Sequence, residues 1–218
     1  MVNVLVIGAH GKVGRIAASN LAAVGDNVFA GFRDSKQFES LPTENGLNPI
    51  LFDLTKSVDD MAQIMKEYHI HKVVFTAGAG GKGGVERTTE IDLDGAVKAM
   101  EAAKATAVEQ FVMVSAAGAD NREVWLKAGI YTYYMMKHYA DRLLQQSGLN
   151  YTILRPTVLS DEAGTGKIKL ITDEQVKGST VTRADVAQMI VEALHSPKAA
   201  NRIVTFEQGD EAIQSVFA

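Results

Sequence analysis

Residues 2–14 read Val-Asn-Val-Leu-Val-Ile-Gly-Ala-His-Gly-Lys-Val-Gly and decide the fold. Six mostly apolar residues that favour β-strands run into three glycines with the spacing G-x-x-G-x-x-G, and a helical segment, residues 15–24, follows. Gly8 allows a tight turn, Gly11 lets backbone approach a pyrophosphate, and Gly14 lets the helix pack on the strand. An ordinary strand-to-helix turn needs only one of these glycines. The stretch therefore predicts a dinucleotide site, with the phosphates at the helix N-terminus.

Composition limits the remaining classes of function. The chain has 218 residues, 46% of them hydrophobic and 22% charged, which suits a single domain over residues 1–218. The net charge of −4 without a basic block argues against nucleic acid or a membrane as the main partner. The absence of cysteine excludes disulfides, zinc–thiolate sites and cysteine catalysis. No apolar run reaches the roughly 20 residues that span a bilayer, and the first strand leaves no room for a signal peptide, so we expect a cytoplasmic protein.

Strand and helix patterns alternate along the whole sequence. Strands are expected at residues 2–7, 27–32, 48–53, 72–76, 110–115, 151–154 and 202–206, and helices at 15–24, 57–68, 89–104, 131–146 and 183–195. Capping boxes are expected at Ser57/Asp60 and Thr182/Asp185. The alternation predicts an α/β fold of the Rossmann type, a doubly wound, mainly parallel sheet with helices on both faces. Its ligand should lie over the carboxyl ends of the strands.

The end of the second strand bears on the choice of nucleotide. Arg33 stands near the position where NAD-binding proteins carry an acidic residue for the ribose hydroxyls, and Lys36 lies one turn further on. A guanidinium can bind a phosphate through two hydrogen bonds, so NADP(H) is favoured over NAD(H). Asp34 keeps NAD(H) open, because a shift of one residue would bring a carboxylate to the ribose.

Several further motifs resemble one family. They are the glycine turn, Arg33, residues 52–54 (Phe-Asp-Leu), 75–78 (Phe-Thr-Ala-Gly), 114–115 (Val-Ser), 133–137 (Tyr-Tyr-Met-Met-Lys) and 147–156 (Ser-Gly-Leu-Asn-Tyr-Thr-Ile-Leu-Arg-Pro). Together they make the chain similar, over nearly its whole length, to the atypical, NAD(P)H-binding short-chain dehydrogenases/reductases. This group includes NmrA-like proteins and flavin/biliverdin reductases.

The resemblance implies a set of cofactor-binding residues. They are Gly8, His10, Gly11, Lys12, Val13 and Gly14 at the turn, Arg33, Asp53 and Leu54 at the adenine, Ala77 and Gly78 along the adenosine, Ser115, Lys137 at the nicotinamide ribose, and Pro156 and Thr157, with Arg155, over the nicotinamide. A small-molecule substrate would enter a pocket built from loops 116–130 and 157–180. Trp125 lies in the first loop, as a pocket wall or as plain packing.

The catalytic residues implied by the resemblance are Tyr133, Lys137 and Ser115. Tyr133 and Lys137 are four residues apart on one helix and share a face, so the ammonium could lower the pKa of a proton-donating phenol. Other tyrosines crowd the same helix, which leaves open whether Tyr133 is the donor or a packed aromatic residue. Two family positions differ: Ala117 stands where the active hydroxyl often lies, and Asp92 is the nearest match to a helix asparagine.

Three functions fit these patterns. The first is an NAD(P)H-dependent oxidoreductase that reduces a small carbonyl, quinone or flavin-like acceptor. The second is an NADP(H)-binding redox sensor without turnover, which would need a protein partner. The third, a sugar-nucleotide epimerase or dehydratase, ranks last because only about 60 residues follow Pro156 and they already supply core elements.

Replacing Arg33 by Ala tests the nucleotide assignment. NADP carries a phosphate that NAD lacks, and a charge-assisted contact of this kind contributes roughly 1.5–3 kcal/mol, so affinity for NADP should fall about 10- to 150-fold. Affinity for NAD should barely change. Calorimetric titration of both nucleotides measures the effect, and equal losses would show that Arg33 acts on the fold or on the shared phosphates.

Overall fold

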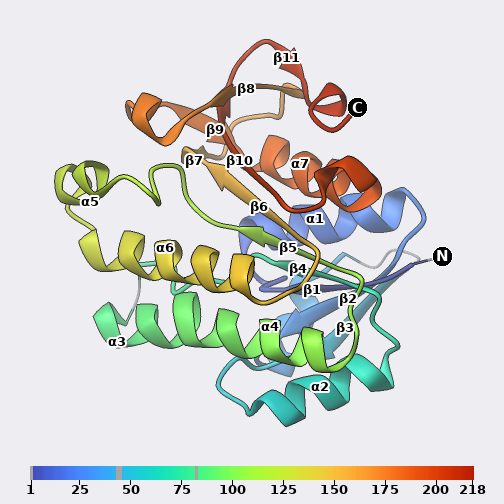
Figure 1. The fold of residues 1–218 in the computed structure, drawn as a ribbon. Coiled ribbons are helices and arrows are strands. Elements are labelled where there is room, and N and C mark those ends of the chain that lie inside the picture. Colours follow the sequence, from blue (N-terminus) through green and yellow to red (C-terminus); the bar gives the residue numbers. More distant parts are fainter. Residues whose placement is uncertain (1, 43–45, 82) are drawn as a thin grey trace.

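The computed structural model describes residues 2–42, 46–81 and 83–218. Its main sheet has the strand order β11-β8-β10-β6-β5-β4-β1-β2-β3 (Figure 1). The strands are β1 (Asn3–Ile7), β2 (Asn27–Phe32), β3 (Leu47–Leu51), β4 (Lys72–Phe75), β5 (Gln110–Val114), β6 (Tyr151–Pro156), β8 (Lys167–Ile171), β10 (Arg202–Gln208) and β11 (Glu211–Ala212). From β3 to β10 every pairing is parallel, which confirms the predicted Rossmann-type α/β sheet.

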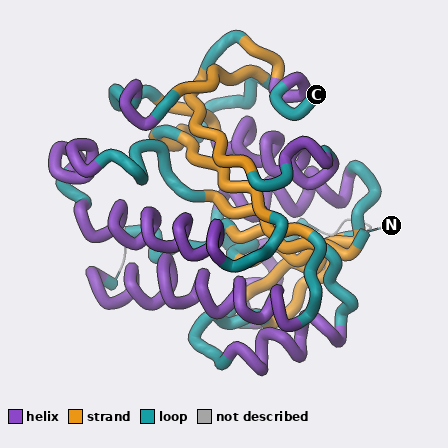
Figure 2. Tube along the Cα trace, in the orientation of Figure 1, coloured by secondary structure: helices purple, strands orange, loops and turns teal. Residues whose placement is uncertain are grey.

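Helices cover both faces of this sheet (Figures 1 and 2). They are α1 (Lys12–Ala23), α2 (Val58–Glu67), α3 (Gly84–Thr88), α4 (Gly95–Ala105), α5 (Arg122–Ala128), α6 (Tyr131–Gln146) and α7 (Arg183–His195). One core joins the sheet to α1 and α7, and the other joins it to α2, α4 and α6. Within the described residues, no helix is both long and apolar enough to cross a bilayer.

Strand β1 lies at the centre of the parallel region. It pairs with β2 on one side and β4 on the other, and Val4 lies opposite both Val28 and Lys72. Val4 and Val6 belong to the core under α1 and α7, whereas Leu5 and Ile7 belong to the core under α2, α4 and α6. All four side chains are buried, as expected for a strand that is covered on both faces.

The helix expected at residues 89–104 is wrong in its start and its regularity. Helical structure begins at Gly84 with α3, continues through a six-residue π-helical turn, Thr89–Asp94, and becomes regular only in α4. A π-turn inserts one extra residue into a helix, and no residue type in the sequence marks such an insertion.

The chain after β6 contains elements that the sequence did not predict. Strands β7 (Val158–Ser160) and β9 (Thr180–Thr182) pair in a separate parallel ribbon, and β8 pairs antiparallel with β10. These strands are short, and partners distant in the sequence decide their pairing. Helix α5 was also missed, because its seven residues are too few for a helical period to emerge.

The two expected helix caps differ in outcome. Ser57 and Asp60 form the complete capping box at the start of α2. Thr182 caps α7 by accepting the Asp185 N–H at 3.0 Å, but the Asp185 carboxylate serves another purpose. It accepts the N–H groups of Thr165 and Gly166 and so fastens the loop before β8 to the start of α7.

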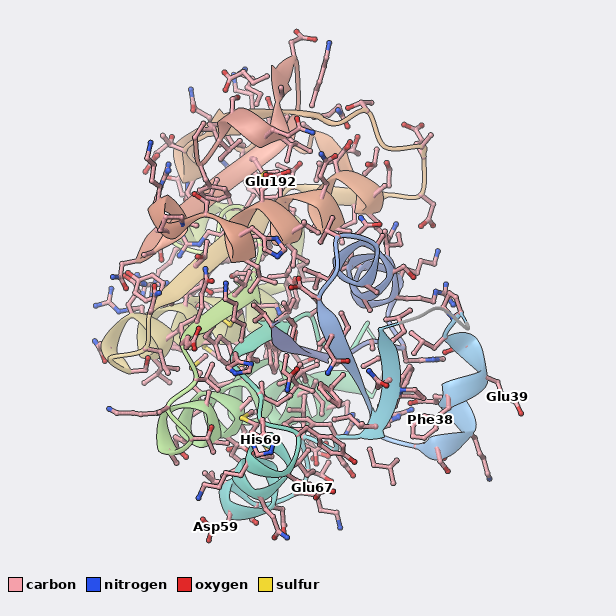
Figure 3. The ribbon with its side chains drawn as sticks, turned by 90° about the vertical axis from the view of Figure 1, so that its right-hand side faces the viewer. Phe38, Glu39, Asp59, Glu67, His69 and Glu192 are labelled. Carbon is pink, nitrogen blue, oxygen red and sulfur yellow. The ribbon has the colours of Figure 1, made fainter. Side chains whose placement is uncertain are left out.

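A short 3₁₀ turn, Ser35–Ser40, folds over the edge of the sheet after β2. In Figure 3, Phe38 lies on the inner side of this turn and Glu39 on the outer side. The Phe38 ring packs on Phe32 at a centroid distance of 5.5 Å. This packing fixes the path of the chain directly after Arg33.

Replacing Gly14 by Ala should destabilise the fold. An added Cβ would lie 2.5 Å from the Gly8 carbonyl oxygen and 2.6 Å from Thr76 Oγ1, so the helix would have to move away from the turn. Overpacking of this kind costs about 1–3 kcal/mol, which exceeds the roughly 1 kcal/mol that Ala gains over Gly in a helix. Urea unfolding measures the effect. In the matched variant Gly11→Ala the nearest atom lies at 3.1 Å, and the loss should be smaller.

Candidate functional site

The glycine turn leads from β1 into α1. Gly8 has a φ of +89°, and a Cβ at this residue would lie 2.7 Å from the backbone nitrogen of Ala77. The Gly11 N–H donates to the Gly8 carbonyl at 2.9 Å and closes the turn. The glycine turn therefore lies directly against the backbone at the end of β4, with no side chain between them. The tight turn at Gly8 is the one that the sequence predicts.

The N-terminus of α1 is suited to bind an anion. Gly11 is its N-cap and provides no side-chain cap, and the first turn has no acidic residue. The backbone N–H groups and the helix dipole there favour phosphate. Lys12 adds a cation, which pairs with Asp161 at 2.5 Å, and both side chains are more than half exposed. Val13 is buried in the core, so only its backbone can face a ligand. These features fit the pyrophosphate of a dinucleotide.

Two expected adenosine residues line one groove of about 340 Å³ beside α2. Arg33 is exposed there, and the Asp53 carboxylate accepts the Thr55 N–H at 2.9 Å. Lys56 lines the same groove. The Asp34 carboxylate instead caps the 3₁₀ turn by accepting the Lys36 N–H at 2.9 Å. The groove thus presents Arg33, whereas Asp34 is engaged in the turn.

The other expected cofactor residues contribute in different ways. His10 is exposed, with Nδ1 3.3 Å from Ser40 Oγ. The Leu54 side chain is buried beside Gly95, so its backbone alone is available. Ala77 follows β4 next to the glycine turn. Gly78 is needed for close approach, because a Cβ there would lie 2.9 Å from an Asp92 oxygen.

Lys137 lies on α6, beside the carboxyl end of β5. Its ammonium is 3.2 Å from Asp92 Oδ1 and 3.5 Å from the Val114 carbonyl oxygen. Both members of the Lys137–Asp92 pair are buried. Burial alone would lower the pKa of Lys137, but the neighbouring Asp92 outweighs it and raises that pKa above its ordinary value. Lys137 is therefore a charged donor at neutral pH.

Tyr133 lies one turn before Lys137, with the ammonium 5.7 Å from the centroid of its ring. The sequence suggests that this ammonium lowers the pKa of the phenol. In the structure burial raises the pKa of Tyr133, and the Asp92 and Asp141 charges add to this, so the opposing effect of Lys137 is overcome. The phenol keeps its proton at neutral pH.

Arg155, on β6, is the centre of a buried cluster that the sequence did not reveal. Its Nε donates to Asp141 Oδ2 at 2.8 Å, and its Nη1 lies 2.8 Å from Asp120 Oδ2 and 3.0 Å from Asp173 Oδ2. The family resemblance implies that Arg155 closes over the nicotinamide. Its Nε and Nη1 instead join α6, the loop after β5 and the turn after β8.

Ser115 follows β5 and points to this cluster. Its hydroxyl donates to Asp141 Oδ2 at 2.9 Å, and the side chain is buried. Burial raises the pKa of Asp141 to about 6, even though Arg155 and Ser115 favour the charged form. Ser115 thus lies at the carboxyl end of β5 with its proton directed at a carboxylate.

The loop after β5 is fastened to the same cluster. Asp173 accepts the N–H groups of Gly118 at 3.1 Å and Asp120 at 2.8 Å. Trp125, in α5, is buried and donates its indole N–H to the Gly118 carbonyl, so it is packing rather than an open pocket wall. The first expected pocket loop therefore has a fixed path.

The end of β6 carries the last two expected residues. The Pro156 carbonyl accepts the Ala117 N–H at 2.9 Å, and the Thr157 N–H donates to the Phe206 carbonyl at 3.1 Å. Thr157 is buried, and its hydroxyl oxygen has no hydrogen-bond partner among the described residues. A buried hydroxyl of this kind is available to a ligand.

The expected residues therefore lie at or beside the carboxyl ends of β1, β2, β3, β4, β5 and β6. Two histidines lie away from these residues: His71 accepts the Asn3 N–H at the opposite end of β1, and His69 lies near Glu67 at the end of α2 (Figure 3). Asp141 was missed as a site residue, and its only sequence signal is its position one turn after Lys137. Asp92 was noted only as the nearest match to the family's helix asparagine, without a role of its own.

Comparisons with known proteins agree with this geometry. A family model described as NAD(P)H-binding matches residues 8–197. A protein of Bacillus subtilis (strain 168) named uncharacterized sugar epimerase YhfK is 38% identical over 211 residues, which cover 96% of each chain.

Two solved structures extend the comparison. The oxidoreductase ylbE from Lactococcus lactis has a TM-score of 0.88 and 28% identity, covering 99% of this chain and 94% of its own. ChuY from Escherichia coli O157:H7, described as an anaerobillin reductase, has a TM-score of 0.77 and 25% identity, covering 95% and 98%.

The raised pKa of Asp141 predicts an unusual dependence of stability on pH. Between its ordinary value of 3.8 and about 6, the folded protein binds more protons at this carboxyl than the unfolded chain does. The free energy of unfolding should therefore fall by about 1 kcal/mol from pH 5 to pH 7 through this group. Asp141→Asn should lack this fall in urea unfolding, whereas Asp161→Asn, at an exposed carboxylate, should keep it. Parallel curves for wild type and Asp141→Asn would contradict the assignment.

Proposed function

The chain belongs to the NAD(P)H-binding family, and from this premise we propose that it is an NADPH-dependent reductase of a small carbonyl, quinone or flavin-like acceptor. One observation carries the proposal: the buried Lys137 ammonium and the protonated Tyr133 phenol lie on one face of α6, beside the carboxyl end of β5. The glycine turn and the open N-terminus of α1 end at the same edge of the sheet.

Each side chain has a proposed role. Bound NADPH would supply the hydride. Lys137 would donate hydrogen bonds to the hydroxyls of the nicotinamide ribose, and the Thr157 hydroxyl would face the nicotinamide with Pro156. Tyr133 would give its proton to the acceptor oxygen as that oxygen gains charge, and water would restore the proton to the phenol. A raised pKa suits this role, because the phenol is fully protonated before each turnover.

Arg33 supports NADP(H) as the nucleotide. It lines the groove with Asp53, and the neighbouring Asp34 is held in the 3₁₀ turn by the Lys36 N–H. A free carboxylate would favour the ribose hydroxyls of NAD, whereas a free guanidinium favours a phosphate.

Two alternative functions, the redox sensor and the sugar-nucleotide epimerase, are distinguished from the reductase by experiment. The redox sensor gains some support from Ser115, whose proton is directed at Asp141, and from Ala117, which has no hydroxyl. A sugar-nucleotide epimerase, a function close to the sugar epimerase for which the Bacillus subtilis relative is named, would need a larger substrate region. After Pro156, α7 covers the main sheet and β10 extends it, so these residues belong to the core fold. The small ribbon of β7 and β9 adds little further material for a substrate region.

The decisive experiment measures NADPH oxidation with a panel of quinones, aldehydes and flavins, with NADH in parallel. Turnover of one acceptor class with NADPH supports the reductase. Tight NADPH binding without any turnover would favour the sensor, and the search would move to a protein partner that distinguishes NADPH from NADP.

Tyr133→Phe tests the proton donor. The change removes one hydroxyl and keeps the ring, so turnover should fall by roughly 10²–10⁴ while NADPH affinity stays nearly constant. Tyr139→Phe is the matched control on the same helix, because Tyr139 is 44% exposed, and it should retain full activity. A Tyr133→Phe enzyme that works at the wild-type rate would show that Tyr133 is structural.

A further inference from the structure

Asp92 makes a buried ion pair that the proposed roles do not yet use. Its side chain is 1% exposed and that of Lys137 is 6% exposed, and the two lie 3.2 Å apart. The second oxygen of the same carboxylate accepts the Ala79 N–H at 2.8 Å. A single carboxylate therefore connects α6 with the loop that follows β4.

The local backbone is arranged for this contact. Asp92 lies inside the π-helical turn Thr89–Asp94, and such turns redirect side chains that a regular helix would direct elsewhere. Gly78 leaves the space that the carboxylate occupies, since a Cβ there would lie 2.9 Å from Asp92 Oδ1. Both departures from regular structure serve the same buried group.

The surroundings of Lys137 explain why the carboxylate matters. The groups that face the ammonium are Asp92 from the π-turn, Tyr133 and Asp141 from α6, and the Val114 carbonyl from β5. Tyr133 is neutral, and Asp141 already binds Arg155 and Ser115. An ammonium removed from water loses its proton readily unless a nearby charge supports it. Asp92 is the nearest anion, and its support outweighs the cost of burial.

We propose that Asp92 is a positioning residue, which keeps the Lys137 ammonium charged and fixed for the nicotinamide ribose. The inference rests on the proposed function, because it concerns the lysine that holds this cofactor. It also gives the π-turn a purpose, because the turn brings a carboxylate into contact with both Lys137 and the Ala79 N–H in the loop after β4.

The first test needs no cofactor. Asp92→Asn keeps the size and the acceptor for the Ala79 N–H but removes the charge, so burial should lower the pKa of Lys137 below its value in the unfolded chain. The unfolded chain then binds more protons, and the free energy of unfolding of the variant should rise between pH 7 and pH 10 relative to wild type. Asp94→Asn is the matched control in the same turn, because Asp94 pairs with Lys98 at 2.9 Å and is 58% exposed. Its curve should stay parallel to wild type, and Lys137→Met in the Asp92→Asn background should abolish the rise.

The second test measures NADPH affinity over the same pH range. Wild type and Asp94→Asn should show the same dependence on pH, whereas Asp92→Asn should lose a further factor of about 10 as Lys137 loses its proton. Asp92→Asn curves that follow Asp94→Asn in both experiments would overturn the inference, and so would a change in stability without a change in affinity. Failure of the proposed function has a separate signature: Lys137→Met would then bind NADPH as tightly as wild type.

Discussion

The close approach of two backbones, at the carboxyl ends of β1 and β4, is the constraint on which the site depends. No side-chain carbon fits between Gly8 and Ala77. Because of this contact, α1 begins directly beside the end of β4. Thr76 strengthens the junction, since its hydroxyl donates to the Ile7 carbonyl at 2.9 Å. The turn and the start of α1 therefore lie at the carboxyl ends of the strands, and Lys137 lies beside the same end of β5.

Local signals explain what the sequence could predict. The glycine spacing, the Ser57 cap and the ends of α6 and α7 depend on residues near one another in the chain, and all were anticipated. The Asp92–Lys137 pair and the Arg155 cluster depend on distant segments, so no local pattern reveals them. The π-turn is a further case, because no residue type marks the insertion of one residue into a single helical turn. The expected site residues lie at or beside the carboxyl ends of the strands, but the sequence did not predict the charges that hold several of them.

Buried ion pairs hold together helix α6, the loop after β5 and the turn after β8. Arg155 is surrounded by carboxylates from three segments, and removing one partner would leave a buried charge without compensation. The cluster therefore contributes little net stability, but it holds the joined loops in one arrangement. His138, which lies on α6 like Asp141, joins the cluster through Asp120 at a distance of 2.8 Å. The loops therefore keep their relative positions because they share ionic partners.

The place of β10 in the sheet also governs the order in which the chain can fold during synthesis. This strand, Arg202–Gln208, lies between β6 and β8, although both of these precede it in the sequence. While the ribosome is still making α7, β10 does not yet exist. One edge of β6 is then unpaired, and β8 has no strand of the main sheet to pair with. Such unpaired strands invite association with other chains. Lys167 and Lys169 alternate with apolar residues along β8, and their charges oppose that association until β10 arrives.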